Sequence, residues 1–155
     1  MPIPVIAIFD IGKTNKKVFL FDETYSLRFE KSDQLPEIKD EDGFPCEDVE
    51  SLTHWVENTF SELLKLADFE IRAVNFSAHG ASFVNVDENG NPVTPLYNYL
   101  KPYPEDLQKT FYASFGGDRF PIITASPVLG HLNSGMQLYW LKKQKSEVFK
   151  KIKYA

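Results

Sequence analysis

The sequence is poor in cysteine, in long apolar runs and in positive charge, and each shortage excludes a class of protein. Cys46 is the single cysteine, so the chain has neither a disulfide framework nor a cysteine-based metal site. The apolar run over residues 5–9 is too short to span a bilayer, and Met1-Pro2 lacks the basic start of a secretory signal. The net charge of −5 argues against a nucleic-acid partner. We therefore expect a cytoplasmic protein with no membrane and no nucleic-acid partner.

What the sequence does contain is the composition of an ordinary globular domain. Hydrophobic residues make up 43% and charged residues 25% of the chain, which indicates a packed core rather than disorder. The 13 phenylalanines and 7 tyrosines predict an aromatic core or platform. A length of 155 residues suits one domain, or a piece of a larger one.

Apolar periodicity predicts an α/β layer with antiparallel strands at its start. We expect strands over residues 5–9, 17–22, 25–31, 71–78 and 82–87, with a loop over 32–46. A helix should begin after Asp48, its N-cap, and pack one apolar stripe on the sheet. The stripe comprises Val49, Leu52, Val56, Phe60, Leu63 and Leu64, and Trp55, one residue off it, is expected to pack as well. Further helices are expected over 104–115, 134–143 and 147–152, with a break at Gly116-Gly117.

A polar turn between the first two expected strands is the first candidate site. It reads Asp10-Ile11-Gly12-Lys13-Thr14-Asn15. Gly12-Lys13-Thr14 imitates the end of a P-loop, but that motif needs glycine where the chain has Ala7, so the P-loop interpretation fails. Gly12 lets backbone N–H groups converge on an anion, and the Asp10 carboxylate would tolerate a phosphate there only with Mg²⁺ between them. The alternative from these residues alone is a hairpin turn without a ligand.

Three stretches of the sequence together resemble the FGGY family of carbohydrate kinases. "IFDIGKTNKKVFLFD" is similar to the first phosphate-binding hairpin of the sugar-kinase, actin and Hsp70 ATPase fold. "AVNFSAHGASFVNVDENGNPVTPLYNY" is similar to the family's sugar-contacting turn and the segment that follows it. "ITASPVLGHLNSGMQLYWLKKQKSEVFKKIKY" resembles a family helix that ends in Trp-Leu-Lys. The resemblance implies a ribonuclease-H-like α/β fold, in which residues 1–155 form an incomplete first domain with a mixed sheet and flanking helices.

The resemblance also implies a nucleotide site at the hairpin. Asp10 matches the aspartate that organises Mg²⁺ through water in the family. The residues that match its ATP-phosphate site are Gly12, Lys13, Thr14, Asn15 and Lys17. Lys13 departs from the small hydroxyl residue that is usual there, and two interpretations stay open. Its ammonium contacts the transferred phosphoryl group, or it points to solvent.

The second implied site is a sugar site. His79, flanked by Ala78 and Gly80, matches the family's sugar-contacting turn. The alternative for His79, from the residues alone, is a core histidine bonded to backbone. Where family members carry an acid and an arginine, this chain has Tyr99 and Lys101, which are substitutes at best.

The activity implied by the resemblance is ATP- and Mg²⁺-dependent phosphorylation of a small sugar, a ketose. Family kinases place the proton-accepting aspartate further along than residue 155, so no catalytic residue is assigned within the chain. We expect this polypeptide to be inactive alone and to work with the remainder of a kinase chain, and a homodimer stays open. The alternative is a stand-alone sugar-binding or regulatory module of the same fold. An actin-like structural protein is disfavoured, because it has no need of a sugar contact at His79.

Overall fold

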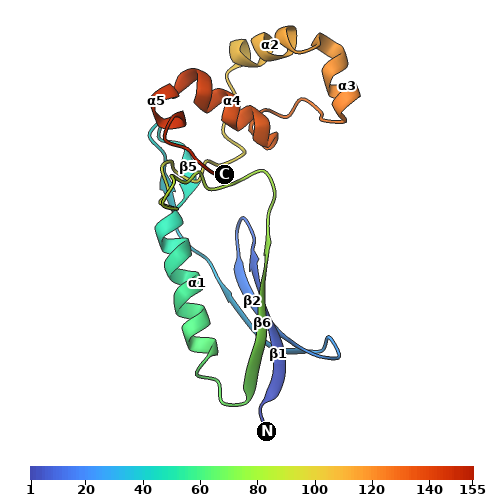
Figure 1. Cartoon of the computed structure of the whole chain (residues 1–155), viewed down its shortest axis with the longest axis vertical. Coiled ribbons are helices and arrows are strands. Elements are labelled where there is room, and N and C mark those ends of the chain that lie inside the picture. Colours follow the sequence, from blue (N-terminus) through green and yellow to red (C-terminus); the bar gives the residue numbers. More distant parts are fainter. The chain divides into compact units, whose positions relative to one another are not determined.

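Figure 1 shows the computed structural model, which describes all residues from 1 to 155. The chain forms two compact units, and each combines two segments of the sequence. The first unit comprises Met1–Glu37 and Glu47–Gly80, and the second comprises Ile38–Cys46 and Ala81–Ala155. No helix combines the length and the apolar character that crossing a bilayer requires.

The first unit is built on a four-stranded mixed sheet, as the sequence predicts. Its strands are β1 (Ile3–Ile11), β2 (Lys16–Asp22), β3 (Leu27–Asp33) and β6 (Phe69–Ala78), in the order β3-β2-β1-β6. Strands β1, β2 and β3 are antiparallel neighbours, whereas β6 runs parallel to β1. The carboxyl ends of β1 and β6 therefore meet at the same edge, next to the turn that joins β1 to β2.

One face of this sheet is covered by helix α1 (Val49–Leu63), which runs beside the strands in Figure 1. Side chains alternate along a strand, so one set of β1 residues faces α1 and the other set lies on the uncovered face. Val5, Ala7 and Phe9 are buried on the α1 side, whereas Ile6 is 40% exposed. The core therefore lies between α1 and the sheet, and the opposite face remains open in this chain.

The sequence predicts the start of α1 and the packing of Trp55 correctly but includes one residue too many in the buried stripe. Asp48 is the N-cap, as expected, because its carboxylate accepts from the Glu50 N–H at 3.1 Å and from the Ser51 hydroxyl at 2.6 Å. Trp55 is only 8% exposed and meets the Phe9 ring edge to face at 5.8 Å. Leu64, expected in the buried stripe, is 62% exposed, because the helix ends beside it.

The expected loop over 32–46 contains a two-stranded ribbon, which the sequence analysis missed. Strands β4 (Glu37–Lys39) and β5 (Pro45–Glu47) pair with each other. The turn between them is held by Asp40, whose N–H bonds the Phe44 carbonyl and whose carboxylate accepts from the N–H groups of Asp42 and Phe44. Gly43 lies in the left-handed region at φ 80°, which glycine adopts without strain.

The second unit is mostly helical. Its elements are α2 (Glu105–Ser114), η1 (Gly117–Arg119), α3 (Phe120–Thr124), η2 (Gly130–Leu132), α4 (Ser134–Gln144) and α5 (Ser146–Phe149). The three expected helices are confirmed, although the last ends three residues early and α3 was not foreseen. The strand expected over 82–87 is wrong: in that segment only Val86 pairs, through isolated bridges to Pro92 and Tyr154.

The core of the second unit is aromatic and is flanked by ammonium groups. Tyr97 and Trp140 pack edge to face with ring centres 5.0 Å apart, beside the fully buried Leu141. The Nζ atoms of Lys101 and Lys145 lie 5.2 and 5.1 Å from the centre of the Trp140 ring. Trp140 therefore serves packing and cation–π contact.

Candidate functional site

The turn between β1 and β2 has the geometry of an anion-binding hairpin. The Gly12 N–H donates to the Asn15 carbonyl at 3.0 Å, so the turn closes tightly. A Cβ on Gly12 would lie 2.8 Å from that same oxygen, which leaves room only for glycine. The backbone N–H groups of Lys13, Thr14 and Asn15 donate no hydrogen bond within the protein. Successive N–H groups in such a turn suit a phosphate, so the chain's own residues fit the group that the sequence implies.

Strand register gathers polar residues on the open face next to this turn. Asp10 in β1 lies opposite Lys17 in β2 and opposite Ser77 in β6. Directly paired residues on one face have Cβ atoms about 4.5–5.5 Å apart. The structure therefore brings the predicted metal residue and a predicted phosphate residue together. The Lys17 ammonium also pairs with Glu30 at 3.4 Å, and both side chains are partly exposed.

Asp10 is the one protein ligand that the sequence predicts for Mg²⁺. No group of three histidine, cysteine, aspartate or glutamate side chains is arranged to hold a metal ion by itself. Mg²⁺ is usually bound by one or two carboxylates together with phosphate oxygens and water. A single half-buried aspartate beside a turn that suits a phosphate fits that pattern.

Two other hairpin side chains are engaged by neighbours in the first unit. Lys13 forms a partly exposed ion pair with Glu37. The Asn15 side-chain oxygen accepts a hydrogen bond from Gln34 at 2.9 Å. Their side chains therefore hold the outer edge of the turn, while the backbone N–H groups of both residues keep no protein partner.

The structure adds a buried lysine that the sequence analysis passed over in favour of its neighbour. Lys16 has a side chain only 3% exposed, and its Nζ lies 2.7 Å from Glu47 Oε2. The same Nζ donates to the carbonyls of Gly12 at 2.8 Å and Lys13 at 3.3 Å. Lys16 therefore fixes the hairpin turn from the α1 side of the sheet.

The predicted sugar turn follows β6 directly and is bonded to the root of the hairpin. Ala78, the last residue of β6, lies opposite Ile11. The His79 N–H donates to the Ile11 carbonyl at 3.1 Å, and His79 Nδ1 lies 3.0 Å from the same oxygen. A Cβ on Gly80 would have no atom within 4 Å, so the turn has open space beside it. The predicted phosphate and sugar residues of the first unit thus adjoin one another.

Tyr99 and Lys101, the other predicted sugar contacts, belong to the second unit. Lys101 is held by two carboxylates, Asp40 at 2.5 Å and Asp42 at 2.6 Å. Burial lowers the pKa of the Lys101 ammonium, but the hydrogen bonds to Asp40 and Asp42 outweigh it and raise the pKa above its usual value. The Lys101 side chain therefore has a structural role within this unit.

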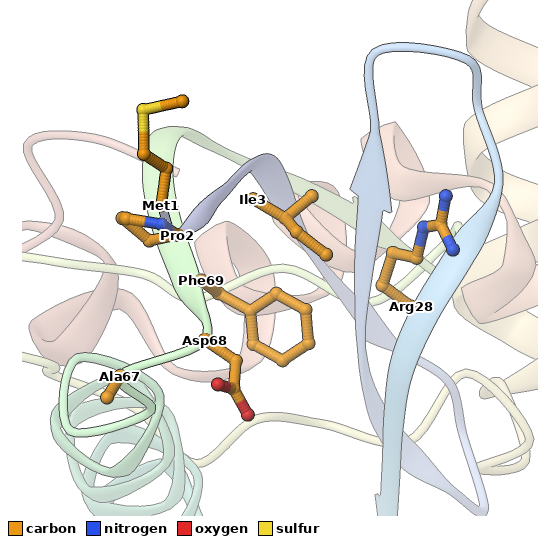
Figure 2. Close-up of a pocket in the computed structure, with 7 residues that line it drawn as sticks. All are labelled: Met1, Pro2, Ile3, Arg28, Ala67, Asp68 and Phe69. Carbon is orange, nitrogen blue, oxygen red and sulfur yellow. The ribbon is translucent and has the colours of Figure 1, made fainter.

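A cavity of about 560 Å³ lies at the opposite end of the sheet, and Figure 2 shows the residues that line it. Ile3, where β1 begins, lines it, whereas the hairpin turn follows Ile11 at the other end of that strand. At about 3.3 Å per residue, these two ends lie about 26 Å apart. Arg28 also lines the cavity, but its guanidinium is paired with Asp22 at 2.5 Å. The cavity is therefore separate from the hairpin and its polar residues.

Comparison with known proteins agrees with this geometry. Residues 5–155 match the FGGY family of carbohydrate kinases, N-terminal domain. A rhamnulokinase from Halalkalibacterium halodurans is 28% identical over 143 residues, which are 92% of this chain and 28% of the relative. Gluconate kinase from Lactobacillus acidophilus has a TM-score of 0.76 at 20% identity, over 97% of this chain and 30% of that one. The ligand-bound xylulose kinase from the same organism has a TM-score of 0.74 at 20% identity, over 96% and 30%.

The chain thus spans less than a third of the length of these relatives. The two solved structures confirm the sugar-kinase fold that the sequence predicts. The family match covers the hairpin, the turn after β6 and the Trp140 helix, which are the three stretches that carry the resemblance. The chain therefore belongs to the FGGY family of carbohydrate kinases and corresponds to its N-terminal domain.

Proposed function

We propose that this chain provides the phosphate-binding hairpin and part of the sugar site of an ATP-dependent kinase whose substrate is a small ketose. The observation that carries the proposal is the double contact of His79 with the Ile11 carbonyl. A sugar hydroxyl bound at His79 would lie beside the turn that holds the phosphates, and direct transfer requires such proximity. Rhamnulokinase and xylulose kinase, which are similar to this chain, are named for ketoses, and they support this choice of sugar.

At the hairpin, the proposal assigns the nucleotide phosphates to backbone N–H groups and the Mg²⁺ ion to the open face of the sheet. The N–H groups of Lys13, Thr14 and Asn15 would bind phosphate oxygens, because donors that are already in place need no reorganisation. Asp10 would help to hold Mg²⁺, which when bound neutralises charge on the phosphates. Lys17 would add positive charge on the same face as Asp10, since the two residues are directly paired.

At the turn after β6, the proposal assigns the sugar to His79 and the residues beside it. The His79 ring is held at the end of β6 by its bond to Ile11. Gly80 leaves open space where a larger residue would project a side chain. Ala78 keeps this turn in register with β1. Tyr99 and Lys101 are further candidates from the sequence, and the proposal requires neither of them.

The proposal also requires the remainder of a kinase chain, and the sheet has an exposed edge that such a chain would cover. Strand β6 pairs with β1 on one side only. Two apolar residues of β6 are exposed, Val74 at 39% and Phe76 at 56%. Parallel strands are normally covered on both faces, and a long exposed edge is rarely left unprotected. We therefore expect residues 1–155 to bind ATP poorly and to be inactive alone, with the remainder of a kinase covering this edge.

A sugar-binding or regulatory module without catalysis is the second candidate. The ion pairs at the hairpin favour it, because Lys13 and Lys17 are already matched by Glu37 and Glu30. A hairpin whose cations are neutralised within the protein attracts a phosphate less strongly. Sugar binding without phosphoryl transfer would then be the function of the fold.

The sugar site is tested by titration calorimetry with rhamnulose, xylulose and gluconate, on the protein in the length that its source produces. We expect a ketose to bind and His79→Ala to weaken that binding at least tenfold, because the ring is the main polar group of the turn. His54→Ala is the matched control, since His54 is an exposed histidine on α1. Equal sugar binding by His79→Ala and the wild type would contradict the role of His79 in sugar binding. Binding of gluconate alone would contradict the proposal that the substrate is a ketose.

A further inference from the structure

Glu47 connects the hairpin to the turn after β6. It is the last residue of β5, and its side chain is only 11% exposed. One carboxylate oxygen, Oε2, lies 2.7 Å from the Lys16 ammonium. The other, Oε1, lies 3.6 Å from His79 Nε2. A single buried carboxylate therefore faces both the lysine that fixes the hairpin and the imidazole of the turn.

The charge of Lys16 makes this position for Glu47 possible. A buried carboxylate is costly unless a cation and hydrogen bonds compensate it. Lys16 supplies the cation, and its remaining bonds go to the carbonyls of Gly12 and Lys13. The pair is thus anchored in the backbone of the hairpin itself.

The orientation of His79 follows from its two neighbours. The Ile11 carbonyl can only accept a hydrogen bond, so it favours the tautomer with the hydrogen on the adjacent Nδ1. Nε2 then points toward Glu47, at a distance longer than a direct hydrogen bond. The ring therefore has a carbonyl at one nitrogen and a carboxylate at the other, and the negative charge of Glu47 favours hydrogen on Nε2.

We propose that Glu47 is a positioning residue of the sugar site, which sets the orientation and tautomer of His79 and couples that ring to the hairpin through Lys16. This inference rests on the proposed role of His79 in sugar binding. A carboxylate beside an imidazole commonly fixes which ring nitrogen carries the proton. Because the same carboxylate holds Lys16, a change at the hairpin is transmitted to the ring that contacts the sugar.

The test replaces the buried pair as a unit, with Lys16→Met and Glu47→Leu in one protein. A buried ion pair replaced by apolar residues of similar size often leaves stability unchanged or higher, so this variant should fold. The matched control is Lys31→Met with Glu62→Leu, because that pair spans 2.7 Å in the same unit and is partly exposed. Both proteins are made in the length that the source produces.

Two measurements on each protein decide the outcome. The first is the affinity for rhamnulose or xylulose, whichever the wild type binds more tightly. We expect the Lys16/Glu47 variant to bind this sugar about tenfold more weakly, which corresponds to about 1.4 kcal/mol. The control variant should change the affinity less than twofold. The second is the ¹⁵N NMR spectrum of the His79 ring without sugar. We expect both tautomers in the wild type and hydrogen on Nδ1 alone in the Lys16/Glu47 variant, because the carboxylate that favours hydrogen on Nε2 is gone while the Ile11 carbonyl remains.

The two measurements also separate this inference from the function on which it rests. An unchanged His79 spectrum or unchanged sugar affinity in the folded Lys16/Glu47 variant would overturn the role of Glu47 and leave it as a partner of Lys16 only. Absence of sugar binding in the wild type would overturn the proposed function, and the ring spectrum would still show whether Glu47 orients His79. Glu47→Gln adds a check, because its amide keeps the size and an oxygen acceptor for Lys16 but removes the negative charge.

Discussion

Gly12→Ala is the substitution that most sharply tests the geometry of the hairpin. The added methyl carbon would lie 2.8 Å from the Asn15 carbonyl oxygen, which is closer than real Cβ atoms approach backbone. That oxygen already accepts the Gly12 N–H at 3.0 Å, so it cannot retreat without stretching this bond. Overpacking costs about 1–3 kcal/mol and a lost hydrogen bond about 1 kcal/mol, so we expect the free energy of unfolding to fall by about 2 kcal/mol. For a chain of this size, the melting temperature should fall by about 4–8 °C.

The two tryptophans allow the effect to be assigned to one unit. Trp55 lies in the first unit and Trp140 in the second, so Trp140→Phe leaves a fluorescent reporter beside the hairpin's own sheet. Urea unfolding is then followed in this background, with and without Gly12→Ala. Gly135→Ala is the control, because a Cβ there meets no atom within 4 Å and alanine is a better helix former.

The same substitution has a functional consequence in the full-length protein. Moving the Asn15 carbonyl also moves the N–H groups of Lys13 and Thr14, so we expect the KM for Mg-ATP to rise at least tenfold. An unfolding midpoint and a KM equal to those of the wild type would refute the tight turn and the role of its N–H groups.

Two predictions concern the second unit, and the fluorescence of Trp140 reports both in a Trp55→Phe background. Burial, helped by the charge of Lys101, lowers the pKa of His131 from 6.5 to about 4, so the unfolded chain binds the proton more tightly. His131 should therefore reduce stability by up to about 3 kcal/mol between pH 6.5 and 4, and His131→Leu should remove this part of the pH dependence. Asp40→Asn removes one partner of the buried Lys101 and leaves Asp42, so we expect a loss of about 3 kcal/mol, whereas no loss in urea unfolding would show that Asp42 alone suffices.

The sequence predicts the elements that have strong local signals. Strand β1 is a β-branched apolar run, and Asp48 with Ser51 marks the start of α1, so both follow from short-range patterns. The strand expected over 82–87 is wrong because this segment makes its hydrogen bonds outside a sheet: the Val86 N–H donates to the Tyr154 carbonyl at 2.9 Å, and the buried Asn85 side chain donates to the Thr94 hydroxyl at 3.0 Å. Short strands such as β4 have only three residues, too few to show a periodicity.

Short-range sequence patterns predict even less of the candidate site. Lys16 and Lys17 are adjacent in sequence, and only strand register tells which one faces α1 and is buried. Glu47 belongs to no recognisable sequence motif, because its role depends on contacts with Lys16 and His79, which lie 31 and 32 residues away along the chain. Its one sequence signal is its place directly before the N-cap Asp48, at the point where the chain enters the core. A carboxylate there needs a buried cation, which could have suggested Lys16.

Sugar-dependent release of ADP tests the central claim most directly. It compares the protein in the length that its source produces with residues 1–155 alone, each supplied with Mg-ATP and the same panel of rhamnulose, xylulose and gluconate. The proposed function predicts turnover with a ketose by a protein longer than this chain, slower turnover by Gly12→Ala at Mg-ATP concentrations below its raised KM, and no turnover by residues 1–155. Robust turnover by residues 1–155 alone, or tight sugar binding by the source-length protein without any ADP release, would contradict it.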